Sequence, residues 1–180
     1  MNQAVIDPFL HACDAGATAV HDVDGVAALL RTLLPCAQRV HVRDGDLPWG
    51  RYLLHEATSY NLQLDVFSAD YTGSVHAHGT WGIFFVLRGA LYVDDHDANG
   101  IRTRSAYIGA GGAQGFCPPV SDWHRVCTPA AGPQTVSLHL YGAGFDLDTG
   151  VARGPDGQPR AYRRGPWGEP AKVQDALVTR

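Results

Sequence analysis

The sequence lacks any long hydrophobic run and any cluster of basic residues. The longest strongly apolar stretch is Trp81–Leu87, seven residues, whereas a membrane-spanning helix needs about 20. The 14 Lys and Arg residues are scattered among 18 Asp and Glu residues, and the net charge is -4. A nucleic-acid-binding surface is expected to be basic. We therefore expect neither a membrane nor a nucleic acid as a partner.

No C-x-x-C pair is present, and we do not expect a secretion signal. The first residues contain no basic stretch followed by an apolar one, and the four cysteines are widely spaced. We therefore expect reduced thiols and a cytoplasmic protein. Histidine, in contrast, is abundant, with 9 in 180 residues. At 45% hydrophobic residues the chain can bury a core, so we expect a single domain, 1–180.

The first part of the chain, residues 1–48, is predicted to be helical. Asp7 and Pro8 resemble an N-cap and a first helical residue, and Gly16 is a stop signal. Apolar residues then recur every three or four positions from about Thr18 or Asp22 to Leu34. Because Pro35 follows directly, we expect the second helix to end there.

From residue 49 to residue 142 the apolar period changes to two, which predicts a β-barrel. Turn signals rich in Gly, Asn and Asp separate the short apolar stretches. Many short strands indicate a sandwich or barrel, and a small barrel encloses a pocket about one ligand wide. Residues 143–180 are rich in Gly, Pro and Arg and are predicted to form a C-terminal arm. The predicted strands are Arg51–Glu56, Tyr60–Ser68, Trp81–Leu87, Ala90–Asp94, Arg102–Ile108, Gly115–Pro118, His124–Thr128 and Gln134–Tyr141.

Two partial motifs surround the most informative histidines. His76 and His78 are separated by one residue, so on a strand both side chains face the same way and can reach one ion. Gly82 and Gly89 follow, and the segment from Pro119 ends in His124. This order resembles the two motifs of the cupin superfamily. The resemblance implies a mainly β fold, a cupin double-stranded β-helix (jelly-roll-like barrel) preceded by one or two short N-terminal α-helices.

The sequence departs from the usual cupin pattern at Gly82. A typical cupin has a metal-binding Glu at that position, so here His76, His78 and His124 remain as three neutral candidate ligands. Such a set leaves a divalent ion its full charge and several open positions. This favours an anionic substrate that binds the metal directly, and a thiolate fits because the metal both deprotonates it and is neutralised by it.

A second cluster lies in the last predicted strand of the barrel. Ser137, His139 and Tyr141 alternate with Val136, Leu138 and Leu140, so the three polar side chains share one face. Polar groups inside a barrel are costly unless they bond one another or a ligand. The three residues can form a relay in which the serine orients the imidazole and the imidazole orients the phenol.

Together these residues resemble the thiol dioxygenase family, which includes the cysteine and 3-mercaptopropionate dioxygenases. The resemblance implies non-haem ferrous iron, Fe(2+), held by His76, His78 and His124, and addition of both atoms of O2 to the sulfur of a small thiol carboxylate, giving a sulfinate. It also implies that Tyr141, oriented by His139 and Ser137, donates a hydrogen bond to the reacting oxygen or to the substrate. The matching segments are Tyr52–His55, His76–His78 with Thr80–Gly82, Val86–Gly89, Asp122–Val126 and Val136–Gly142.

Substrate recognition is the least determined part of this prediction. A thiol acid needs a cation for its carboxylate, and we expect Arg51 or Arg153 to supply it; Arg160, Arg163 and Arg164 are expected at the surface. If Arg51 and Arg153 both reach the pocket, mercaptosuccinate joins cysteine and 3-mercaptopropionate as a candidate substrate. The thioether crosslink of animal cysteine dioxygenases is not expected, since the segment 81–84 has no cysteine.

Two alternatives stay open at this point. The chain could be a cupin that binds a small ligand without chemistry, or an enzyme that uses Zn, Ni or Mn, because three imidazoles accept all of these ions. The oligomeric state is equally open between a monomer and a small homo-oligomer.

Overall fold

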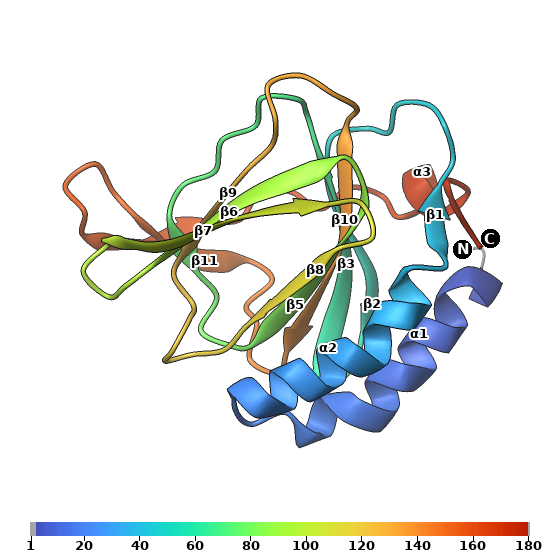
Figure 1. The fold of residues 1–180 in the computed structure, drawn as a ribbon, viewed down its shortest axis with the longest axis horizontal. Helices are drawn as coiled ribbons and strands as arrows, with labels where there is room; N and C mark the ends of the chain where they lie inside the picture. Colours follow the sequence, from blue (N-terminus) through green and yellow to red (C-terminus); the bar gives the residue numbers. More distant parts are fainter. Residues whose placement is uncertain (1–2, 180) are drawn as a thin grey trace.

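Two N-terminal helices pack side by side against one sheet of the molecule (Figure 1). The structure is a computed structural model that describes residues 3–179. Residues 1, 2 and 180, at the outer ends of the predicted N-terminal region and C-terminal arm, lie outside the described residues. The helices are α1 (Gln3–Gly16) and α2 (Val23–Ala37), joined by the short 3-10 helix η1 (Ala17–Ala19).

Both prolines that were expected to mark helix boundaries lie inside the helices instead. α1 begins at Gln3, upstream of Pro8, because Val5 and Ile6 are buried and stabilise the additional turn. α2 begins where Asp22 caps it, its carboxylate accepting from the N–H of Gly25 at 2.8 Å. It continues through Pro35 to the buried Ala37. Each proline removes one backbone hydrogen bond and crowds the carbonyl group four residues earlier. Burial of the neighbouring apolar residues offsets this cost.

The sheet beneath the helices has five antiparallel strands. Residues of β3 and β10 alternate across it, and Leu62, Leu64, Leu138 and Leu140 point into the core shared with the helices. The residues between them face the opposite way, toward the second sheet. In spatial order the strands are β2 (Gly50–Glu56), β3 (Tyr60–Phe67), β10 (Thr135–Gly142), β5 (Gly82–Arg88) and β8 (Ala113–Phe116).

A second antiparallel sheet of six strands closes the barrel, and residues of both sheets line the cavity between them. This is a mainly β, cupin-like fold with N-terminal helices, as the sequence predicted. Each of the eight predicted strands overlaps an observed one. In spatial order the strands are β12 (Pro159–Arg163), β11 (Thr149–Arg153), β4 (His76–Ala77), β9 (His124–Cys127), β6 (Ala90–His96) and β7 (Arg102–Gly109).

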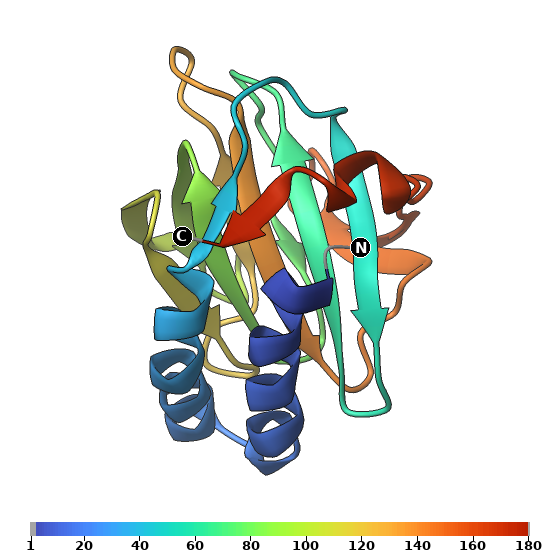
Figure 2. The same ribbon diagram turned by 90° about the vertical axis from the view of Figure 1, so that its right-hand side faces the viewer.

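The C-terminal segment is more regular than the predicted extended arm. β11 adds to the six-stranded sheet beside β4, and β12 forms a hairpin with β11. After the short helix α3 (Ala171–Gln174), the last strand β13 (Leu177–Thr179) pairs with β1 (Val40–Val42), which joins the C-terminal segment to the strand that follows α2 (Figure 2). Within residues 3–179, no helix combines the length and the apolar character needed to cross a membrane.

Candidate metal centre

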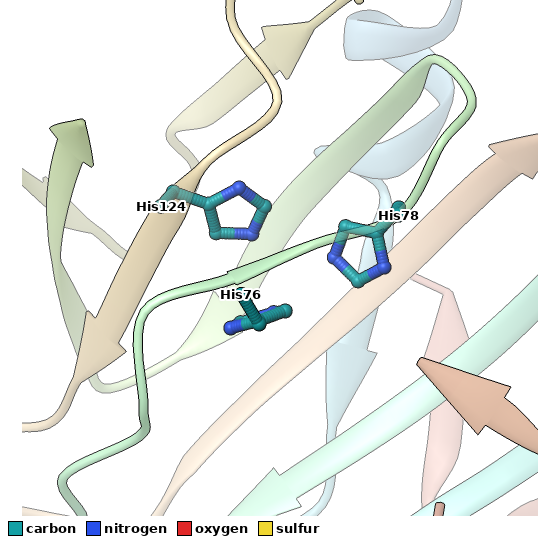
Figure 3. Close-up of side chains that lie close together, drawn as sticks. All are labelled: His76, His78 and His124. Atoms are coloured by element: carbon teal, nitrogen blue, oxygen red, sulfur yellow. The ribbon is translucent and has the colours of Figure 1, made fainter. Parts of the chain in front are cut away.

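The three histidines predicted as metal ligands converge on one point. His76 and His78 project from one segment and His124 from the neighbouring strand, β9 (Figure 3). The pairing of His76 with His124 in the β4–β9 register brings the two motifs together. One ring nitrogen from each imidazole lies within 4.8 Å of the others. This cluster could therefore hold a metal ion.

In His76 and His124, a hydrogen bond at Nδ1 leaves the lone pair of Nε2 free. The Nδ1–H of His76 donates to the carbonyl oxygen of Ser74 at 2.9 Å, and the Nδ1–H of His124 donates to that of Asp122 at 2.8 Å. Because a carbonyl only accepts, both Nδ1 atoms carry the proton, and both Nε2 atoms of the neutral rings are available as ligands.

His78 gives the clearest sign that the site suits a metal. Both of its ring nitrogens are buried and lack a hydrogen-bond partner among the described residues. Its backbone is held in place, since the carboxylate of Asp122 accepts from the N–H groups of His78 and Gly79 at 2.8 and 3.0 Å. A buried polar atom without a partner is costly, and an ion bound between the three rings would satisfy it.

Burial keeps the three imidazoles uncharged. Desolvation lowers the pKa of His76 to about 4, and it lowers the pKa of His78 and that of His124 well below their usual value. The neighbouring imidazoles act in the same direction, because a charge on one ring would repel a charge on the next. Neutral imidazole is the form that binds metals, so the site is prepared for an ion at neutral pH.

An aromatic ring occupies the space where a side chain at position 82 would lie. A Cβ atom on Gly82 would fall 2.3 Å from Cζ of Phe116, closer than van der Waals contact allows. The same phenyl ring stacks on His78, with ring centroids 5.3 Å apart. The structure thus gives a packing reason for the missing carboxylate: Phe116 and Gly82 are complementary, and the three histidines remain the candidate donor set.

The predicted Ser-His-Tyr relay is formed by side chains on β10. Ser137 Oγ lies 2.8 Å from Nε2 of His139, and Nδ1 of His139 lies 3.1 Å from the hydroxyl oxygen of Tyr141. Burial lowers the pKa of His139 and raises that of Tyr141, so both are neutral at pH 7. The phenol ring lies against His78, with centroids 4.6 Å apart. The relay therefore ends beside the candidate metal ligands.

The histidine cluster lines a cavity of about 490 Å³ together with His139 and Tyr141 of the relay. Arg51, one of the two candidates for the substrate carboxylate, lines it too, with its guanidinium 4.7 Å from the ring centroid of Trp167. Arg153 is not among the residues that line it, so the structure does not bring this second candidate to the cavity. Its guanidinium donates to the carbonyl oxygens of Ala98 and Gly157 and lies over Trp123. The reason is the strand register: Ala152 pairs with the cavity-lining His76, and the next residue, Arg153, faces the opposite side of the sheet.

Arg164, expected at the surface, lines the cavity in place of Arg153. The segment 162–168 returns across the cavity after the β11–β12 hairpin. Nε of Arg164 donates to the carbonyl oxygens of Asp146 and Thr149 at 2.9 and 2.7 Å, and the guanidinium lies 4.3 Å from the ring centroid of Phe145. The sequence signal for this position is weak, since only the fold of the tail separates it from the exposed Arg160 and Arg163.

Polar residues on β3 complete the cavity wall and were missed by the sequence analysis. Gln63 and Asp65 are buried and line the cavity, and Asn61 is buried on the same face with its amide oxygen accepting from Gln63. In register they lie opposite Tyr141, His139 and Ser137. The same alternation of polar and apolar residues that marked β10 is present in segment 61–66 and could have revealed them.

Comparison with known proteins supports no more specific assignment. No family model matches the chain. A cupin 2 domain-containing protein from Halorhodospira halophila is 18% identical over 66% of this chain and 82% of its own, with a TM-score of 0.46. KdgF from Halomonas sp. is 18% identical over 56% of this chain and 87% of its own (TM-score 0.43). A cupin superfamily protein from Desulfitobacterium hafniense is 11% identical over 61% of this chain and 88% of its own, with a TM-score of 0.43.

The fold and the site together define a class. The chain has a cupin-like fold with a three-histidine cluster, His76, His78 and His124, that could bind a metal ion. These features are those of a possible metalloenzyme.

Proposed function

We propose that the protein is an iron-dependent thiol dioxygenase that converts a small thiol carboxylate to its sulfinate. One observation carries the proposal: three neutral imidazoles line the same cavity as Arg51, Arg164 and the His139–Tyr141 end of the hydrogen-bonded Ser-His-Tyr relay. A relay that ends beside metal ligands suits proton movement during a reaction, which a simple binding pocket does not require.

Iron is the proposed metal, with His76, His78 and His124 as its ligands. Bound Fe(2+) would supply the redox chemistry that joins dioxygen to a thiolate. Overall, R–S⁻ and O2 give R–SO2⁻: two S–O bonds form, the O–O bond breaks, and the sulfur loses the electrons that reduce both oxygen atoms. No other co-reactant is needed.

The arginines are proposed to bind the carboxylate of the substrate. Arg51 and Arg164 both line the cavity, and a guanidinium can donate two parallel hydrogen bonds to a carboxylate. Arg164 is held in place by the carbonyl oxygens of Asp146 and Thr149, so little ordering is needed when the substrate binds. Other residues of the segment 162–168 line the same cavity.

Tyr141 is proposed as the donor to the reacting atoms. In the proposed arrangement the hydroxyl of Ser137 donates to Nε2 of His139 and the Nδ1–H of His139 donates to the Tyr141 oxygen. This tautomer leaves the phenolic hydrogen of Tyr141 free to bond an atom in the cavity. His139 and Ser137 act through Tyr141 and are positioning residues. The high pKa of Tyr141 keeps its proton available as a donor.

Oxygen uptake by the protein loaded anaerobically with Fe(2+) tests the proposal. We expect stoichiometric uptake with at least one of cysteine, 3-mercaptopropionate and mercaptosuccinate, and formation of the matching sulfinate. Protein loaded with Zn, Ni or Mn in parallel separates iron from the other ions that three imidazoles accept. Absence of uptake with every thiol and every metal would refute the enzyme assignment and favour a cupin that only binds ligands.

A further inference from the structure

The cavity wall holds a carboxylate for which the proposed oxidation has no use. Asp65, on β3, is 7% exposed and lines the cavity. Its Oδ1 atom is buried and has no hydrogen-bond partner among residues 3–179. Its Oδ2 atom lies 3.7 Å from Nε2 of His139, a nitrogen that already bonds Ser137. A buried carboxylate is costly unless a cation or several donors compensate it.

The nearest cation in the sheet register does not compensate Asp65. Arg51 lies directly opposite it in the β2–β3 pairing, so both side chains leave the same face of the sheet. The guanidinium of Arg51 is instead engaged elsewhere, since it lies over Trp167 and donates to the carbonyl oxygen of Gly165 at 3.2 Å. A negative and a positive group therefore face one cavity from adjacent strands without pairing with each other.

Asp65 and Arg51 occupy directly opposite positions on adjacent strands, an arrangement that suits an α-amino acid. Directly opposite residues in antiparallel strands have Cα atoms about 4.5–5.5 Å apart, and an α-amino acid carries its ammonium and carboxylate on a single carbon. The rings of Phe67 and Tyr71, with centroids 5.1 Å apart, line the same cavity, and aromatic faces attract cations.

We infer that Asp65 binds the ammonium group of an α-amino thiol acid, with Arg51 on its carboxylate. The inference rests on the proposed function for the thiol and adds a subsite for the amine. Mercaptosuccinate becomes a poor substrate on this account, because its second carboxylate would face Asp65. Cysteamine, with an amine and no carboxylate, would use only Asp65.

Anaerobic calorimetry on the full-length, Fe(2+)-loaded protein tests the subsite without relying on turnover. L-Cysteine and 3-mercaptopropionate differ only in the amine, so the ratio of their dissociation constants isolates its contribution. A charge-assisted hydrogen bond is typically strong enough to predict binding of cysteine about tenfold or more tighter. In Asp65→Asn, which keeps the size of the side chain, we expect the ratio to fall to about one while affinity for 3-mercaptopropionate stays within about twofold.

The matched control is Asp95→Asn, which neutralises a partly buried carboxylate that does not line the cavity and should keep the wild-type ratio. An unchanged ratio in Asp65→Asn, no cysteine preference in the wild-type protein, or no cysteine binding would each overturn the inference. A role of Asp65 confined to orienting His139 would instead lower kcat equally for both thiols and leave the affinity ratio intact. Failure of the proposed function would appear separately, as a measurable affinity ratio without oxygen uptake.

Discussion

Replacing His139 with alanine separates the relay from the metal site. The imidazole is buried between Ser137 and Tyr141, at 2.8 and 3.1 Å from their hydroxyl oxygens. Its removal leaves two buried hydroxyls without this partner and opens a void. We expect His139→Ala to lower the free energy of unfolding by about 2–5 kcal/mol. Urea denaturation of the metal-free protein measures this change.

The effect on turnover should be larger than the effect on folding, and metal content should not change. General acid–base groups contribute about 10²–10⁴-fold to rate, so we expect His139→Ala to reduce kcat by about this factor while iron per chain stays at the wild-type level. Tyr141→Phe removes only the hydroxyl and serves as the matched variant, with a similar loss of kcat at a smaller stability cost. Near-wild-type turnover, or loss of iron from His139→Ala, would refute the role assigned to the relay.

Three further predictions follow from the cavity. Gly82→Ala should lower the free energy of unfolding, measured in urea, by about 1–3 kcal/mol, because the new Cβ would meet Phe116, and adding Phe116→Leu should recover part of the loss. An unchanged free energy of unfolding in Gly82→Ala would contradict the packing argument. Arg164→Met should raise the KM for the thiol acid about tenfold or more in steady-state oxygen uptake, whereas Arg153→Met should leave it unchanged. Equal effects of the two substitutions would show that Arg164 does not bind the substrate carboxylate. The metal-free protein should lose stability as the pH falls from about 6.5 toward about 4, because His76 is protonated over this range in the unfolded chain but stays neutral when buried in the folded protein. Equal urea midpoints at pH 7 and pH 5 would argue against neutral buried imidazoles.

The strand that carries the relay was readable from the sequence because its pattern has a single explanation. Ser137, His139 and Tyr141 alternate with apolar residues, and period two places them on one face regardless of the rest of the fold. The histidine pair His76 and His78 follows the same rule. His124 required the motif order as well, since only the pairing of β4 with β9 brings it to the pair.

The arginines and the helix boundaries could not be read in the same way. Arg153 and Arg164 both lie in a tail without periodicity, and their positions depend on the β11–β12 hairpin, a tertiary feature. Pro8 and Pro35 are strong local breakers, yet burial of the residues around them extends both helices. In each case tertiary packing outweighs the local signal.

Isotopically labelled dioxygen gives the most direct test of the central claim, that the three-histidine cavity is where a thiol is oxidised. The Fe(2+)-loaded protein is incubated with L-cysteine or 3-mercaptopropionate, and the product is analysed by mass spectrometry. The account predicts a sulfinate in which both oxygen atoms carry the label, and no such product from His78→Ala. Disulfide as the only product, or a sulfinate oxygen derived from water, would contradict it.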